Sequence, residues 1–131
     1  MAEFSDYMEN KIIEVMRATT FTAAAAYVAL FTSTATGAEI EAGTLTNEVI
    51  GGAYARQLAG LSVPSNGTTS NAADITFPTA TADWGTVGFV ALMDSLTGGN
   101  VYMYSALDAN KIVNNGDTFK INLGDLDVTV S

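Results

Sequence analysis

The side chains that could do chemistry in this 131-residue chain are carboxylates, tyrosines, lysines and serines, because the sequence contains no histidine and no cysteine. Histidine is the commonest general base and transition-metal ligand, and cysteine supplies thiolate nucleophiles, disulfides and metal ligands. The Gly-x-Ser-x-Gly motif of serine hydrolases is also absent. A serine nucleophile would therefore need a lysine as its general base, and the sequence does not exclude such a Ser–Lys pair. We therefore expect a protein that is not an enzyme, has no catalytic residues and binds no cofactor.

Paired carboxylates are the remaining material for a metal site. Asp125 and Asp127 are two residues apart, so they would share one face of a strand and could bind a hard cation such as calcium. The alternation of Asp or Asn with Gly and a closing Glu that forms an EF-hand loop is missing. We interpret the pair as a solvated strand face and predict no metal site.

Four large side chains are candidates for an interface. Trp84 is the only tryptophan, and its alternatives are a core position, which we favour, or an exposed subunit contact. Tyr102 and Tyr104 are expected to share a strand face, where they would be buried, contact a subunit or stack on a sugar. Arg56 is expected to pair with a carboxylate, within the fold rather than across an interface.

Charge and hydropathy exclude several classes of partner. Five Lys plus Arg against fourteen Asp plus Glu give a net charge of −9, which repels nucleic acid. No apolar run approaches the length needed to span a bilayer, and acidic Glu3 and Asp6 stand where a signal peptide would be basic. We expect neither nucleic acid nor a membrane as a partner.

One amphipathic helix is predicted over about residues 5–18. Met8, Ile12, Val15 and Met16 recur at helical spacing on one face, and Ser5 is a suitable N-cap. We expect this helix to lie across one end of a sheet. The alternative is an arm that docks on a neighbouring subunit.

The region from about residue 24 to 131 has the pattern of short strands separated by Gly, Asn, Asp and Ser. Residues 33–52, including the stretch 35–50, are expected to be mainly a long loop, with or without a short segment at Leu45–Ile50. Residues 96–100 are expected to be a hairpin connection, and residues 112–123 a second hairpin. The predicted strands are Tyr27–Thr32, Ala53–Leu58 with Leu61–Val63, Asp74–Phe77, Thr86–Met93, Val101–Ala106, Ile112–Val113, Thr118–Leu123 and a last segment at Leu126–Val130. The fold class is therefore mainly β: one domain over residues 1–131, a β-sandwich or barrel of about eight short strands with an N-terminal helix.

Several short motifs, in order along the chain, resemble those of a group of small structural proteins of tailed bacteriophages and prophages. They are Gly51–Gln57, Ser70-Asn71, Asp74–Pro78, Asp83–Val87, Thr97–Asn100 and Gly116–Lys120. The resemblance implies a component of the virion, assembled in the bacterial host cytoplasm. Members of this group are described as capsid decoration (cement) proteins or as tail-fibre-like proteins.

Two structural roles follow, and an enzyme ranks third. The first hypothesis is a capsid decoration protein that binds the outside of the head lattice through the major capsid protein and stabilises the lattice. The alternative is a tail or tail-fibre accessory protein that contacts tail proteins and contributes to host attachment. In either role we expect a homo-oligomer.

Overall fold

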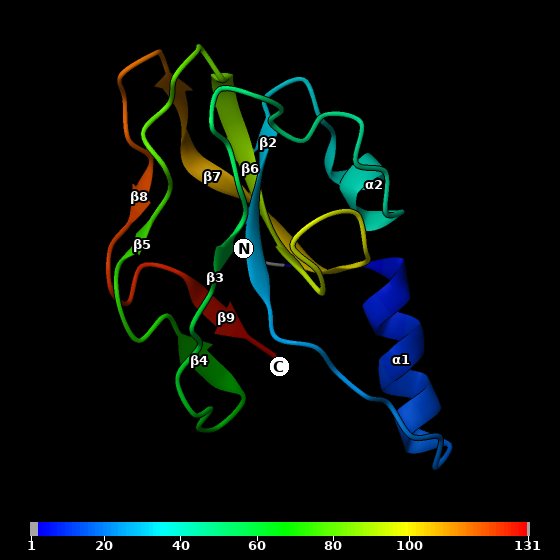
Figure 1. Cartoon of the computed structure of the whole chain (residues 1–131). Coiled ribbons are helices and arrows are strands. Elements are labelled where there is room, and N and C mark those ends of the chain that lie inside the picture. The colour runs from blue at the N-terminus through cyan, green and yellow to red at the C-terminus, as the bar shows by residue number, and fades with distance from the viewer. Residues whose placement is uncertain (1–2, 131) are drawn as a thin grey trace.

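The structure, a computed structural model, describes residues 3–130 and consists of small antiparallel sheets with two helices (Figure 1). In chain order the elements are β1 (Glu3–Phe4), α1 (Asp6–Met16), β2 (Tyr27–Thr32), α2 (Gly37–Glu41), β3 (Gln57–Leu58), β4 (Thr68–Ser70), β5 (Ile75–Thr76), β6 (Gly85–Met93), β7 (Val101–Val113), β8 (Lys120–Ile121) and β9 (Asp127–Thr129). The predicted mainly β class with an N-terminal helix is confirmed.

The main sheet has five strands in the order β1-β7-β6-β2-β3. Its centre is β6, which pairs along its length with β2 on one side and β7 on the other. Strand β2 alternates Val28 and Leu30 on one face with Ala29 and Phe31 on the other, and all four are fully buried. This confirms the prediction that Tyr27–Thr32 is a central strand with two apolar faces.

Two further sheets, β4-β9 and β5-β8, have two strands each, so the sheets are open and no barrel forms among the described residues. The core is divided between the two faces of the main sheet. Val28, Leu30, Phe77 and Trp84 belong to one group of buried side chains, which we call the Trp84 cluster. Phe31, Ile40, Met93 and their neighbours form a second group, the Ile40 cluster, which α2 covers.

The segment of residues 33–52 is mainly loop, as predicted, but it contains a short helix that the sequence did not predict. The five residues of α2 lie within it, capped by Thr36, whose hydroxyl accepts a hydrogen bond from the Glu39 amide while the Glu39 side chain bonds back to Thr36. This capping box satisfies amide groups that a short helix leaves free. Ile40 then fills the second core cluster, which explains why so short a helix is retained.

The predicted hairpin over residues 112–123 is wrong. Strand β7 continues to Val113 because Ile112 and Val113 extend the ladder with β6, and β8 pairs with β5 instead. The expected strand at residues 53–63 is reduced to β3. The connection at residues 96–100 is confirmed: the Asp94 carboxylate accepts the Asn100 amide, and Gly99 takes a positive φ of 75° that closes the turn.

Helix α1 occupies the predicted range, and Ser5 is its N-cap as predicted. Ser5 also fixes the start of the helix to β7, because its hydroxyl donates to the Val101 carbonyl. Figure 1 shows α1 extending from there away from the sheets, beside the segment that leads into β2. No residue of α1 is buried, and Val15 and Met16 are 51% and 75% exposed. Met8 and Ile12 on the same face are half-buried, so the helix does not bury its whole apolar face as expected of a helix lying across a sheet. Neither described helix is long and apolar enough to cross a membrane.

Candidate functional site

The most elaborate polar arrangement in the described chain is built around Arg56, immediately before β3. Its Nε and Nη2 donate to the two oxygens of Glu48 at 2.8 and 2.7 Å, a bidentate ion pair. Its Nη1 donates to the carbonyls of Ser95 and Gly98 at 2.7 and 2.8 Å. Arg56 is 5% exposed, so this buried cation is fully paired. The predicted intramolecular pairing of Arg56 is confirmed.

Tyr54 completes the arrangement. Its hydroxyl donates to Glu48 Oε2 at 2.7 Å and accepts from the Leu30 amide at 3.0 Å. Burial, and then the Glu48 carboxylate, raise the pKa of Tyr54, while hydrogen bonding to Glu48 raises the pKa of Arg56. Both groups therefore keep their protons at neutral pH, and the arrangement holds loops together rather than exchanging protons.

The loops that Arg56 joins enclose a groove of about 440 Å³. Val49, Gly51 and Ala55 line one side, and Leu96 to Gly98 of the β6–β7 connection line the other. The exposed side chains of Ile50 (83%) and Leu96 (56%) stand at its rim. Glu48 and Arg56 are the only charged residues that line this groove, and they neutralise one another. We call this surface the Ile50–Leu96 groove.

Trp84 lies in the core, as favoured, with 5% of its surface exposed. Its ring meets the Tyr54 ring edge to face at 5.5 Å, and its Nε1 donates to the Gly52 carbonyl at 2.9 Å. Gly52 has a φ of 56°, and a Cβ there would lie 2.8 Å from Trp84 Nε1, so only glycine fits. Trp84 therefore packs against the loop that contains Gly52, next to the Ile50–Leu96 groove. Its own side chain is buried and does not line the groove.

Tyr102 and Tyr104 do not form the expected aromatic strip. The register between β6 and β7 shifts at Leu92 and Met93, which makes Tyr102 the extra residue of a β-bulge. Tyr102 packs against Phe21 and hydrogen-bonds Ala24, whereas Tyr104 is 7% exposed and donates to Glu3 at 2.7 Å. Burial, and then Glu3, raise the pKa of Tyr104. A contact role for the four candidates stays a prediction, and three of them expose less than a tenth of their surface.

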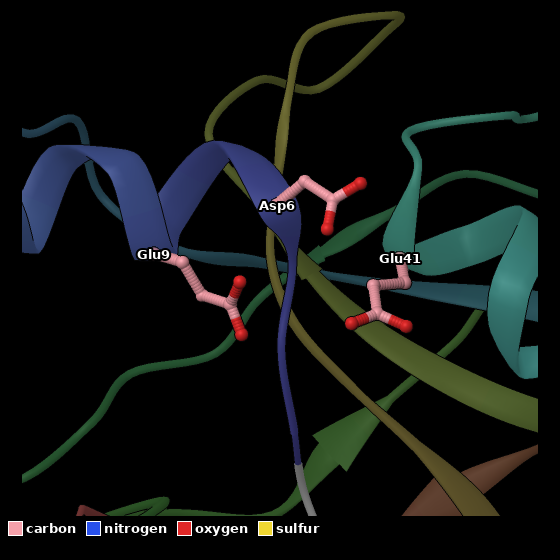
Figure 2. A group of neighbouring side chains, drawn as sticks. All are labelled: Asp6, Glu9 and Glu41. Atoms are coloured by element: carbon pink, nitrogen blue, oxygen red, sulfur yellow. The ribbon is translucent and has the colours of Figure 1, made fainter.

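A carboxylate cluster appears that the sequence did not predict (Figure 2). Asp6 and Glu9 of α1 and Glu41 of α2 bring one oxygen each within 4.8 Å of one another. Asp6 and Glu9 lie in the first turn of α1, where the helix dipole favours negative charge, and Glu41 accepts from Tyr104 at 3.2 Å. Each carboxylate thus has a role in the fold. Asp125 and Asp127, the pair weighed from the sequence, are exposed and belong to no such group of described residues.

The sequence gives some indication of the Arg56–Glu48 pair but none of the carboxylate cluster. Arg56 is one of only two arginines in the sequence, but its partner Glu48 lies in the segment predicted to be mainly loop. Glu41 also lies in that segment, so the carboxylate cluster had no local pattern to reveal it.

Comparison with protein-family models gives a match over residues 3–129, to the model described as podophage GP4 fiber I protein gp80. The match covers nearly the whole chain, including every helix and strand described above. No curated protein matches the sequence.

Proposed function

Because the chain belongs to the podophage GP4 fiber I protein gp80 family, we propose that it is a tail-fibre component that contributes to attachment of the virion to its host. The observation that carries the proposal is the extent of the family match, residues 3–129. The family is one of phage fibre structural proteins, so the virion is the expected location and other tail or fibre proteins are the expected partners.

The family favours the tail alternative over capsid decoration, the hypothesis that the sequence put first. Its described residues form small antiparallel sheets, so we propose that this β-rich unit is one compact part of the fibre assembly. A structural role is consistent with the polar chemistry of the fold. Buried Arg56 and the partly buried Glu48 and Tyr54 bond to one another and to backbone, which stabilises loops.

We further propose that a second copy of the chain covers the Ile50–Leu96 groove in a homo-oligomer. Two molecules of charge −9 repel one another, and the repulsion is least where a surface carries no net charge. The Ile50–Leu96 groove meets this condition because Glu48 and Arg56 cancel. It also offers two exposed apolar side chains, which gain free energy when water is removed from them.

Localisation on purified virions tests the attachment proposal. Cryo-electron microscopy of particles, with copy number from quantitative mass analysis, is expected to place a few copies at the tail. Hundreds of copies spread over the head would contradict the proposal.

The homo-oligomer is tested separately by sedimentation equilibrium of the isolated chain. The variant Ile50→Ser with Leu96→Ser is expected to be monomeric at concentrations where the natural sequence associates. Leu123→Ser, which changes a side chain that is also exposed (62%) but lies outside the groove, is the matched control and should associate normally. Equal association of all three chains would exclude the groove as the contact.

A further inference from the structure

A second groove, of about 310 Å³, lies between the main sheet and the C-terminal segment. Val90 to Leu92 of β6 and Met103 to Asp108 of β7 line one side, and Asp125 to Val128, which lead into and include most of β9, line the other. We call this the β7–β9 groove. It is distinct from the Ile50–Leu96 groove, since the two share no lining residue.

Both walls of the β7–β9 groove contain strands with an unpaired edge. One edge of β7 pairs with β6 except at the Tyr102 bulge and over residues 107–110, and the other edge pairs with β1 only at Met103 and Tyr104. From Ser105 onward no strand of residues 3–130 pairs with that second edge. Strand β9 pairs with β4 alone. Free strand edges offer backbone N–H and C=O groups to an added strand.

The groove is apolar where it meets the core. Val90, Leu107, Leu126 and Val128 are partly buried and pack against the Trp84 cluster. Their remaining exposed surface faces the groove that they line. An extended segment at the free edge of β7 places every second side chain on one face, so it would present apolar residues to Leu107, Leu126 and Val128 and its other residues to solvent.

The polar lining of the β7–β9 groove is acidic. Asp108, Asp125 and Asp127 are exposed, and none of them takes part in an ion pair with another described residue. Among residues 3–130, no Lys or Arg lines the groove. The complementary side chains are therefore cationic. A second copy of this chain, with five cations against fourteen carboxylates, is a poor source of them.

We propose that the β7–β9 groove binds an extended segment of a partner protein in which apolar side chains alternate with Lys or Arg. The segment adds as a strand along β7 beyond Tyr104, places its apolar side chains on Leu107, Leu126 and Val128, and places its cations beside the three aspartates. This inference deepens the proposed function, because it names the surface and the chemistry by which the chain joins another virion protein.

The probe is a short synthetic peptide in which Val and Lys alternate, with a Val–Glu peptide of the same length for comparison. The full chain is titrated with each peptide while backbone amide chemical shifts are recorded. We expect the Val–Lys peptide to shift the amides of Ser105–Asp108 and Asp125–Val128 and to bind more weakly as salt is added. The Val–Glu peptide should leave these amides unchanged.

Two matched variants distinguish binding at the β7–β9 groove from attraction to the overall negative charge of the chain. Changing Asp108, Asp125 and Asp127 to Asn should weaken binding of the Val–Lys peptide about tenfold, the combined effect expected of three exposed charge pairs. Changing Asp6→Asn, Glu9→Gln and Glu14→Gln removes the same charge from α1, none of whose residues lines the groove, and should leave binding within about twofold. All these changes keep side-chain size. Amide chemical shifts that stay unchanged away from the substituted residues show that each variant is folded.

The proposal is overturned if the Val–Lys peptide does not bind, if the two peptides bind equally, if the shifts map elsewhere, or if the two triple variants behave alike. These outcomes concern the isolated chain. They would leave localisation at the tail, which is measured on virions, unaffected.

Discussion

At the scale of single residues, Arg56 has the largest structural consequence. One side chain links Glu48, which bridges to β2, to the β6–β7 connection, through four hydrogen bonds. The loops on both sides of the Ile50–Leu96 groove are therefore fixed by one buried cation. Loss of that cation leaves a nearly buried carboxylate and two carbonyls without their partner.

We predict that Arg56→Ala lowers the free energy of unfolding by about 3–5 kcal/mol, because removing one partner of a buried pair leaves an uncompensated charge. Urea denaturation measures this. The control is Lys11→Ala, which removes a pair with Glu14 that is about one-third exposed and should cost under about 1 kcal/mol. A loss for Arg56→Ala no larger than for the control would contradict the assigned role.

Asp74 connects the turn before β5 to β8. Its carboxylate accepts the Leu123 amide at 2.7 Å and pairs with Lys120 at 3.2 Å. The Leu123 amide, and then Lys120, lower the pKa of Asp74. A carboxyl group whose pKa is lower in the folded chain stabilises the fold above its unfolded pKa, which is about 3.9, and loses this effect as pH falls.

We predict that the natural chain is more stable than Asp74→Asn above about pH 5, and that the difference shrinks as pH falls through about 4 towards the lowered pKa. Paired chemical denaturation curves over this range provide the measurement. Taking the difference between the two chains cancels the titration of the other carboxylates. A difference that is constant with pH would rule out the stabilising role of ionised Asp74.

At the scale of elements, α1 depends on its first turn. An isolated helix of eleven residues is marginal in water, and no residue of α1 is buried. Its attachment rests on Ser5, which is 1% exposed, accepts the Met8 amide at 3.1 Å and bonds to Val101 and Tyr102 of β7. Ser5 therefore both caps α1 and attaches it to β7.

We predict that Ser5→Ala lowers the free energy of unfolding by about 1–3 kcal/mol, because it removes a helix cap and the buried hydrogen bond that Ser5 donates to the Val101 carbonyl. Amide hydrogen exchange should show faster exchange throughout α1. Thr36→Ala, which removes the exposed cap of α2, is the comparison and should leave exchange in α1 unchanged. Unaltered protection of α1 in Ser5→Ala would show that other contacts hold the helix.

At the scale of the whole molecule, charge separates the two proposed contacts. The chain carries −9, so two copies meet against repulsion, whereas a cationic segment is attracted. Added salt weakens both effects. The same change of solvent should therefore act in opposite directions on the two grooves.

We predict that self-association through the Ile50–Leu96 groove strengthens as ionic strength rises from about 0.01 M to about 1 M, since the screening length falls from about 30 Å to about 3 Å. Over the same range, binding of the Val–Lys peptide should weaken. Sedimentation equilibrium and peptide titration measure the two responses. Self-association that weakens with salt would show that ion pairs, not an uncharged surface, hold the copies together.

Much of the secondary structure and the class of the fold follow from local patterns. The alternation in Tyr27–Thr32 and the apolar run of β6 identify the central strands, because a strand buried on both faces must be apolar on both. The spacing of Met8, Ile12 and Val15 with a serine before them identifies α1 and its cap. The absence of histidine and cysteine limits the available chemistry whatever the fold.

Pairing between distant segments was decided only by the tertiary structure. Strand β7 continues to Val113 because β6 is long enough to pair with it, and β8 joins β5 rather than the neighbouring residues. The bulge at Tyr102 separates two tyrosines that simple alternation would place together. The bonds from Arg56 to Ser95 and Gly98, the Asp6–Glu9–Glu41 cluster and both grooves join residues far apart in the chain. Sequence periodicity reports how a segment meets water and core, but not which other segment it meets, because that depends on how the whole chain closes.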